Sequence, residues 1–349
     1  MFNGKGRFGL ATLASIGLAI VISNTPAAAW KRGSVQTFAV MPSGTPMIEG
    51  LTVGRNGNVY VSTFNPTGSG NSKLLTFNAQ GKLLKNVTIQ NSSSAMLGLA
   101  ILPKTDAVLA IDFGKGQVLS VNPEDGTSSV CVTLPGPPAP GTTGLNALTF
   151  DATGNIYISD SFQGIIWRRT PDSTFCGEAK LWVSSDLLKP NGGIPPFGAN
   201  GLGFNKAGTA LFVANTAMDT IVKIPVTGGT AGTPEVFTNS INGADGLILD
   251  SDDNLWVAAN QADEIVVVDP TGKVIAKLGD FDGVQNGETS GLLFPASPAF
   301  SKDGHWLFVT NLELDLRTIG GPQTVDSQWA AKVERHSIAK LGVRIPPVQ

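Results

Sequence analysis

The feature that most constrains this chain of 349 residues is a pattern that returns six times. Each copy has a leading residue, a pair such as Gly-Leu or Ala-Leu, a strand, a tight turn, and a second strand that ends in a small polar residue. The leading residues are Glu49, Leu97, Asn146, Asn200, Asp245 and Ala296. Their spacings are 48, 49, 54, 45 and 51 residues. A period near fifty is typical of the blades of a propeller.

The strand signals within each copy are regular. The second strand of four copies is a β-branched or aromatic triplet after a turn, at residues 59–61, 156–158, 255–257 and 307–309. Two further strands follow in most copies, and no long helical pattern interrupts them. We therefore predict an all-β fold, a six-bladed β-propeller with four-stranded blades. A sandwich of many short strands would leave the regular period unexplained.

The two ends of the chain are expected to complete the same blade. The last copy ends with a third strand in WAAKVERHSI, and the missing fourth strand is available in SVQTFAVM, before Glu49. Joining the termini removes the open edge that an incomplete ring would expose. We expect residues near 35 to 41 to pair with residues near 329 to 338, so that an N-terminal strand closes the ring.

The first 29 residues have the pattern of a cleaved secretory signal peptide. Lys5 and Arg7 precede an apolar run over residues 8–23, and Ala27-x-Ala29 offers a signal-peptidase site. A permanent anchor is the alternative, but the run has about 16 residues where spanning needs roughly 20. We expect residues 30–349 to form the propeller of a secreted protein, periplasmic or extracellular, with no membrane segment after cleavage.

Export affects the interpretation of the two cysteines. Cys131 and Cys176 are the only ones in the chain, and both would lie in an oxidising compartment. A disulfide between them and two buried thiols that pack as small hydrophobic groups remain equal alternatives.

Charge and histidine content exclude several classes of function. The chain has 24 Lys and Arg against 27 Asp and Glu, a net charge of −3, and no basic block, which argues against nucleic-acid binding. Two histidines in the whole chain argue against a His-rich zinc site and a Ser-His-Asp triad. No sequence feature indicates an oligomeric state.

Four of the six leading residues are oxygen donors: Glu49, Asn146, Asn200 and Asp245. The first strand of each blade lines the central channel of a propeller, so these side chains are expected to converge on its axis. Two carboxylates buried there would repel each other and lack solvation, and a divalent cation removes both problems. Oxygen ligands without His or Cys favour Ca²⁺, although Mg²⁺ or Mn²⁺ would also fit. The alternative is that each side chain caps backbone groups at a strand start.

Two segments resemble a known family. GANGLGFNKAGTALFVAN and GADGLILDSDDNLWVAAN are similar to the fourth- and fifth-blade signatures of the gluconolactonase and senescence-marker-protein family. These calcium-dependent six-bladed propellers form a superfamily with the squid diisopropylfluorophosphatase and the paraoxonases. The resemblance covers essentially the whole mature chain. It implies a catalytic metal held by a Glu in blade one, Asn in blades three and four and Asp in blade five, which match Glu49, Asn146, Asn200 and Asp245.

The chain also departs from the family pattern. Gluconolactonases often have Arg-x-Asn ahead of the blade-three ligand, where the Arg holds the sugar, and here that place is Gly144. Relatives that hydrolyse phosphotriesters use a His near the blade-six position, where this chain has Ala296-Ser297. His305 and His336 are expected to be surface or packing residues.

These residues lead to one hypothesis on chemistry and one alternative. A channel cation with open positions can polarise a carbonyl and activate water, and Asp245 is the nearest candidate for a general base. We therefore expect a metal-dependent hydrolase of small-molecule lactones or related esters, with the reaction type implied by the resemblance. The alternative is a non-catalytic secreted propeller that acts as a binding or scaffold protein with a structural calcium.

Long loops before Asn146, Asn200 and Ala296 are expected to line the mouth of the channel. They carry little charge, and we predict a substrate rim of Leu188, Phe197, Leu293 and Phe294. An apolar rim favours a substrate with a hydrophobic part, such as an acyl lactone or aryl ester, unless these side chains only cover the blade ends. Polar residues recur about fifteen positions after most leading residues and are expected to cap turns: Asp112, Asp160, Asn215, Asn260 and Asn311.

Overall fold

The computed structural model describes residues 1, 4, 32–102, 105, 107–135 and 142–344. The predicted signal peptide and the predicted first residue of the mature chain, Trp30, lie outside the described residues. Residues 32–344 belong to one unit, and the boundary at residue 29 stays a prediction. Within the described residues no helix is long and apolar enough to cross a membrane.

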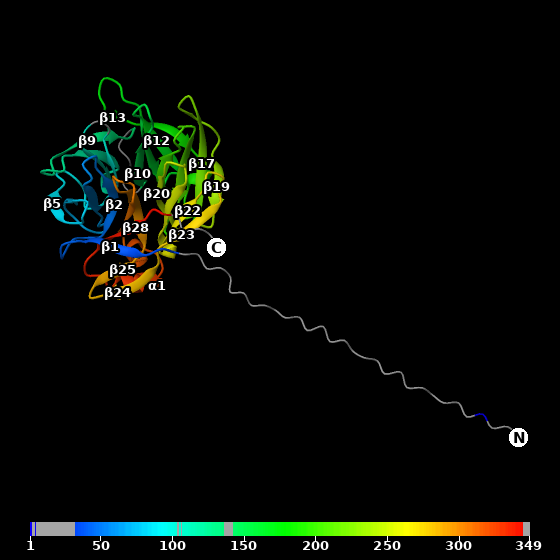
Figure 1. Cartoon of the computed structure of the whole chain (residues 1–349). Coiled ribbons are helices and arrows are strands. Elements are labelled where there is room, and N and C mark those ends of the chain that lie inside the picture. Colours follow the sequence, from blue (N-terminus) through cyan, green and yellow to red (C-terminus); the bar gives the residue numbers. More distant parts are fainter. Residues whose placement is uncertain (2–3, 5–31, 103–104, 106, 136–141, 345–349) are drawn as a thin grey trace. The chain divides into compact units, whose positions relative to one another are not determined.

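Six small antiparallel sheets form the blades, and the first three follow one another in chain order (Figure 1). Blade one consists of β2 (Ile48–Val53), β3 (Val59–Thr63), β4 (Lys73–Phe77) and β5 (Leu83–Thr88). Blade two consists of β6 (Met96–Ile101), β7 (Val108–Asp112), β8 (Gln117–Val121) and β9 (Ser128–Thr133). Blade three consists of β10 (Leu145–Phe150), β11 (Ile156–Asp160), β12 (Ile165–Arg169) and β14 (Lys180–Ser184).

The remaining blades complete the ring. Blade four consists of β15 (Ala199–Phe204), β16 (Ala210–Asn215), β17 (Thr220–Thr227) and β19 (Glu235–Asn239), with the short β18 (Thr230–Ala231) beside β17. Blade five consists of β20 (Ala244–Leu249), β21 (Leu255–Ala259), β22 (Glu264–Val268) and β23 (Val274–Leu278). Blade six consists of β26 (Pro295–Phe300), β27 (Trp306–Asn311), β28 (Ser337–Gly342) and β1 (Val35–Val40). The six inner strands contact one another in the closed order β2, β6, β10, β15, β20, β26 and back to β2. This confirms the predicted six-bladed propeller.

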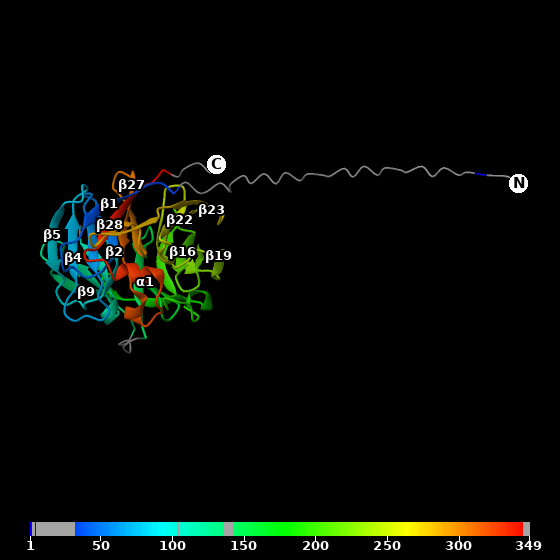
Figure 2. The ribbon, with the colours of Figure 1, turned by 90° about the horizontal axis from the view of Figure 1, so that it is seen from below.

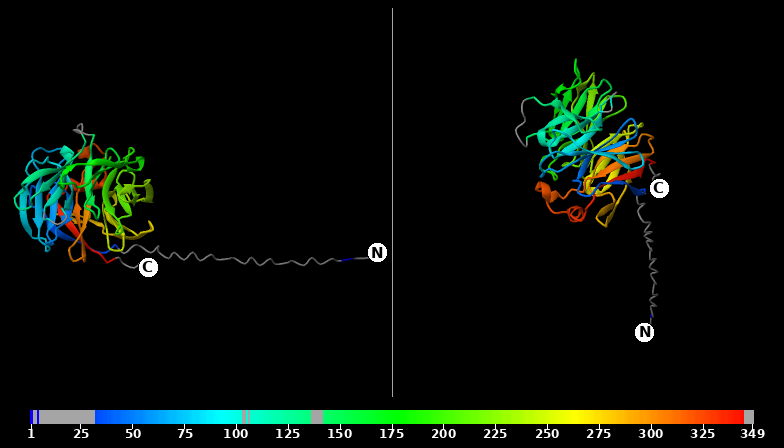
Figure 3. Two further views of the ribbon diagram at one scale, coloured as in Figure 1. Left: turned by 90° about the horizontal axis from the view of Figure 1, so that it is seen from above. Right: turned by 90° about the vertical axis from the view of Figure 1, so that its left-hand side faces the viewer.

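The N-terminal strand closes the ring, as predicted. β1 pairs antiparallel with β28, with Val35 opposite Leu341 and Val40 opposite Ser337, and the two strands lie side by side in Figures 2 and 3. The expected partner segment was wrong over residues 329–335, whereas the backbone N–H of Met41 donates to the carbonyl of His336. Residues 325–330 form the helix α1 (Val325–Ala330) instead, because the side chain of Thr324 accepts a hydrogen bond from the backbone N–H of Ser327 and caps the helix. The Trp329 ring then packs against Phe281, with ring centres 5.4 Å apart.

Short elements connect the blades. They are β13 (Gly177–Glu178), β24 (Phe281–Gln285), β25 (Glu288–Gly291) and the 3₁₀ turns η1 (Phe113–Lys115), η2 (Asp186–Leu188), η3 (Asn260–Ala262) and η4 (Leu316–Ile319). β24 and β25 form a hairpin outside the blades.

Side-chain hydroxyls join neighbouring blades near the axis. The hydroxyl of Ser62 donates to the Leu97 carbonyl, that of Ser161 to Ala199 and that of Thr216 to Ala244. Thr310 in blade six donates to the Glu49 carbonyl in blade one at 2.7 Å and so joins the last blade to the first. Each of these bonds satisfies a buried carbonyl that the inner strand of one blade presents to the preceding blade.

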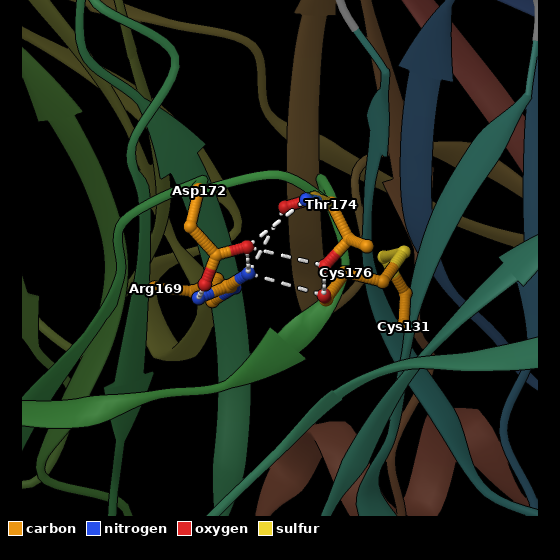
Figure 4. A network of polar contacts seen from close by, with 5 residues as sticks. All are labelled: Cys131, Arg169, Asp172, Thr174 and Cys176. Atoms are coloured by element: carbon orange, nitrogen blue, oxygen red, sulfur yellow. Dashed lines mark hydrogen bonds and ion pairs between the residues drawn. A yellow bond between two sulfur atoms is a disulfide. The ribbon is translucent and has the colours of Figure 1, made fainter.

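Cys131 and Cys176 form a disulfide, which decides between the two alternatives left open by the sequence. Cys131 lies on β9 of blade two, and Cys176 lies in the loop between β12 and β14 of blade three, so the bond joins adjacent blades. Figure 4 shows the Arg169 guanidinium beside it, donating to the carbonyl oxygens of Thr174 at 3.0 Å and Cys176 at 3.1 Å and to Asp172. The loop is therefore fixed on both sides of the disulfide.

Candidate metal centre

The four predicted ligands lie in one cavity at the centre of the ring. Glu49, Asn146, Asn200 and Asp245 all line it, and each is at most 5% exposed. The leading residues of the other two blades are apolar: Leu97 lines the same cavity, and Ala296 is fully buried. The structure thus brings together side chains that are up to 196 positions apart (245 − 49) in the sequence.

A β-bulge in every inner strand presents the leading residue to the axis. The pairing register shifts at the same place in each blade, for example between Ile48 and Leu51 in β2 and between Ala244 and Leu247 in β20. A bulge re-aims side chains relative to the regular pleat. Glycines next to the leading residues allow the blades to approach closely: a Cβ on Gly50 would lie 2.1 Å from the Leu97 carbonyl oxygen. The Gly-Leu pair of the repeat is therefore a packing requirement at the hub.

The hydrogen bonds inside the cavity leave two carboxylate oxygens without partners. The amide nitrogen of Asn200 donates to Thr216 Oγ1 at 2.9 Å, and that of Asn260 donates to Asp245 Oδ2 at 3.1 Å. Glu49 Oε2 and Asp245 Oδ1 are buried with no hydrogen-bond partner among the described residues. A buried carboxylate oxygen without a partner costs free energy, so these two atoms indicate a missing positive group.

The electrostatics of the cavity point the same way. Burial raises the pKa of Asp245 to about 6, although the hydrogen bond from Asn260 and the nearby Asn200 amide and Gly246 backbone N–H oppose the shift. Burial, together with repulsion by Asp245, raises the pKa of Glu49 well above its ordinary value. Two interacting carboxyls in a dry channel disfavour the doubly ionised state unless a cation compensates it.

The donor set fits a hard divalent cation. Glu49 and Asp245 supply a charge of −2, and Asn146 and Asn200 supply neutral amide groups. The described residues contain no group of three or more His, Cys, Asp or Glu side chains placed to hold a metal, so binding here depends on the amides and on water. That combination is typical of Ca²⁺ rather than Zn²⁺.

The sequence prediction missed the role of Asn260. Four residues at its repeat position bond to loop or turn backbone as expected, with the side-chain oxygens of Asp112, Asp160, Asn215 and Asn311 accepting from backbone N–H groups. Asn260 instead lines the cavity and bonds to Asp245, and its own Oδ1 has no hydrogen-bond partner among the described residues. A Cβ on Gly243 would lie 1.9 Å from that oxygen, so only glycine fits beside it.

Apolar side chains surround the polar centre. The cavity is otherwise lined by Thr216 and by Phe64, Leu97, Pro195, Phe197, Phe294, Leu312, Leu314 and Ile319. The space open to the centre of a water molecule is about 30 Å³, where one water needs roughly 10–15 Å³. The cavity therefore has room for a cation and one or two waters, and a larger ligand requires the apolar side chains to move.

Only half of the predicted rim lines this cavity. Phe197 and Phe294 do, whereas Leu188 and Leu293 are fully buried and do not. Leu188 closes the turn η2 and packs in the core beside Tyr157 and Ala199. Leu312, Leu314 and Ile319 were not predicted; they follow the sixth blade's second strand, as Phe64 follows that of the first.

A ring of apolar side chains separates the candidate site from the other end of the channel. Two positions after each leading residue the chain has Leu51, Leu99, Leu148, Leu202, Leu247 and Pro298, all of them buried. They line a second hollow of about 310 Å³ that shares no lining residue with the first. The candidate site therefore opens towards one end of the channel only.

Both histidines lie away from the cavity. His305 is exposed beside Asp303, and His336 contacts the buried carboxylate of Glu313. This agrees with the surface and packing roles expected for them.

A family model described as the SMP-30/gluconolactonase/LRE-like region matches residues 93–279, more than half of the chain. The chain belongs to this SMP-30/gluconolactonase/LRE-like family. No curated protein sequence matches it. Among solved structures it is similar to a gluconolactonase from Xanthomonas campestris, with a TM-score of 0.62 and 14% identity over 90% of this chain and 91% of the other.

Two further solved structures are similar to the present chain. One is regucalcin from Agrobacterium tumefaciens, described as a calcium-binding protein, with a TM-score of 0.60 and 18% identity over 89% of this chain and 98% of the other. The other is virginiamycin B lyase from Staphylococcus aureus, with a TM-score of 0.53 and 15% identity over 89% and 99% of the two chains. At these identities the likeness shows the shared propeller fold.

Proposed function

We propose that this propeller is a metal-dependent hydrolase of lactones or related esters. The observation that carries the proposal is the pair of unpartnered carboxylate oxygens, Glu49 Oε2 and Asp245 Oδ1, in a cavity that both residues share with two asparagines. The family supports a lactonase-type activity, and the calcium-binding description of one similar structure supports Ca²⁺ as the cation.

The residues have distinct roles in the proposed reaction. Glu49, Asn146, Asn200 and Asp245 would hold the cation, which when bound supplies a Lewis acid that polarises the substrate carbonyl and makes water more acidic. Asp245 accepts the proton of the attacking water, and Asn260 holds its other oxygen in place. Water adds to the carbonyl carbon, the bond from that carbon to the ring or alkoxy oxygen breaks, and the leaving oxygen receives the proton. The apolar walls keep other water away from the carboxylates.

The direct test is metal analysis of the purified mature protein followed by assays on a panel of lactones and aryl esters. We expect one bound calcium, and hydrolysis that a chelator abolishes and added Ca²⁺ restores. Asp245→Asn should abolish turnover while the circular dichroism spectrum stays unchanged. Hydrolysis that is insensitive to the chelator in metal-free protein would contradict the proposal.

The second candidate, a binding or scaffold propeller with a structural calcium, is favoured by one observation. The cavity is too small for a substrate beside the cation, and eight apolar side chains close around it. Under this alternative calcium raises the melting temperature but no member of the panel is hydrolysed.

We also propose that the protein is secreted. The disulfide Cys131–Cys176 supports this, because structural disulfides persist in oxidising compartments. Detection of a mature N-terminus at Trp30 in an exported fraction tests it.

A further inference from the structure

Four phenylalanines from four different blades form a cluster beside the candidate site. Phe64 follows β3, Phe113 begins η1, Phe162 follows β11 and Phe197 precedes β15. The ring centres of Phe113 lie 6.2 Å from Phe64, 5.8 Å from Phe162 and 6.3 Å from Phe197, and those of Phe162 and Phe197 lie 5.7 Å apart in a stacked pair. These distances are in the range of favourable aromatic packing.

This phenylalanine cluster is continuous with the cation cavity. Phe64 and Phe197 line the cavity, whereas Phe113 and Phe162 extend the cluster away from it. Phe64 is buried, but Phe113, Phe162 and Phe197 are only half-buried. Partly exposed aromatic rings that border a polar site are typical of a ligand-binding surface.

Glycine at position 144 is what allows the Phe162 ring to take its place. A Cβ on Gly144 would lie 2.8 to 3.0 Å from three atoms of that ring, so any side chain there would displace it. The polar side chain that follows Phe162, Gln163, already donates to Asp160 and Thr143. This side of the cavity therefore presents an aromatic face, and the amide N–H groups of Gln163 are already used within the protein rather than for a sugar hydroxyl.

We infer that the phenylalanine cluster binds the alkyl or aryl group of a substrate whose carbonyl lies at the cation cavity, and that Phe162 determines this specificity. The inference rests on the proposed function for the position of the carbonyl. Among the described residues that line the cavity, Glu49 and Asp245 are the charged ones, so an uncharged, apolar substrate loses least on desolvation. A polyhydroxylated lactone would leave its hydroxyls unpaired against phenylalanine rings.

Binding of non-hydrolysable ketones tests this without requiring turnover. Acetophenone, butyrophenone and hexanophenone are titrated calorimetrically into the calcium-loaded mature protein. Each added methylene buried against the cluster should tighten binding, so Kd should fall about tenfold for every two methylenes. Phe162→Ala should flatten this dependence to less than threefold, and Phe162→Leu should retain part of it. The matched control is Phe175→Ala, because Phe175 is a half-buried loop phenylalanine that packs on Phe150 and does not line the cavity.

The outcomes separate the inference from the proposed function. Binding that depends on chain length and on Phe162, in a protein that hydrolyses no ester, supports the cluster and contradicts the hydrolase. The inference is overturned if neither Kd nor turnover depends on the length of the alkyl chain. It is also overturned if Phe162→Ala shows the same dependence of Kd on chain length as the wild type. A dimer that Phe162→Ala converts to monomer would assign the cluster to a second copy of the chain and also overturn the inference. In every variant the calcium-induced rise in melting temperature should equal that of the wild type, which shows that the cation site is intact.

Discussion

The strongest consequence of the metal centre concerns stability without the cation. Burial raises the pKa of Asp245 from 3.8 to about 6. A shift of roughly 2 pKa units corresponds to about 3 kcal/mol that the folded, metal-free protein loses by keeping this carboxylate ionised at neutral pH. Asp245→Asn removes the charge, so the metal-free variant should be more stable than metal-free wild type at pH 7.5, by up to about 3 kcal/mol.

The pH dependence has a defined sign. A carboxyl whose pKa is higher in the folded than in the unfolded state binds more protons when folded, so metal-free wild type should gain stability as pH falls from 7 to about 4. The advantage of Asp245→Asn should therefore shrink over that interval. Calcium narrows the stability difference at pH 7.5, because it stabilises wild type more than Asp245→Asn, and this gain falls at low pH, where protons compete with calcium for Asp245. At 100 times its Kd, calcium adds about 2.7 kcal/mol, a rise of roughly 5 °C in the melting temperature of a protein of this size.

The assay is thermal and urea unfolding of both proteins at pH 5, 6 and 7.5, with chelator and with excess Ca²⁺. Comparing wild type with Asp245→Asn at each pH cancels the titration of groups that do not interact with Asp245. The pKa of Glu49, which Asp245 raises, differs between the two proteins and contributes to the measured difference. Metal-free Asp245→Asn that is less stable than wild type at pH 7.5, or an equal calcium shift in both proteins, would refute the reasoning.

Three further predictions concern residues around the hub and the blades. Asn260→Ala should weaken calcium binding about 10- to 100-fold, because it frees Asp245 Oδ2; its blade-four counterpart, Asn215→Ala, should leave the calcium Kd unchanged in the same titration. Replacing Cys131 and Cys176 by serine opens a loop of 45 residues and should cost about 4 kcal/mol in urea unfolding, whereas reductant should leave the stability of the serine variant unaltered. Glu313→Ala should cost about 3–5 kcal/mol, because this buried carboxylate contacts His336 and Thr289; Glu288→Ala, which breaks the more exposed pair with Arg335, should stay within about 1 kcal/mol.

The repeat made the propeller predictable because each of its six copies has the same alternation of strands and turns. It also made the four ligands predictable, since equivalent positions of six blades must meet at the axis. Residues 325–330 escaped this logic: a strand was expected from the place of Trp329 in the last copy of the repeat, whereas the Thr324 cap and the contact of Trp329 with Phe281 favour a helix.

The second group of misses concerns residues whose role depends on neighbours distant in sequence. Asn260 occupies the same repeat position as four turn-capping residues, and it differs because Asp245 lies within hydrogen-bond reach and Gly243 leaves room for it. Leu188 was expected at the rim because its loop is long and apolar, but the turn η2 directs it into the core between blades. The signal that could have found Leu312 is its alignment with Phe64, both directly after the second strand of a blade.

The pairing of β1 with β28 has a consequence for biogenesis. The strand that the ribosome makes first acquires its partner only after residue 342 has been synthesised, because Val35 pairs with Leu341. Until then the sheet of blade six is incomplete, and the ring of blades cannot close. A nascent chain of this design stays incompletely folded until residues 337–342 have been made, and loss of residues 35–40 or of residues 337–342 would open the same blade.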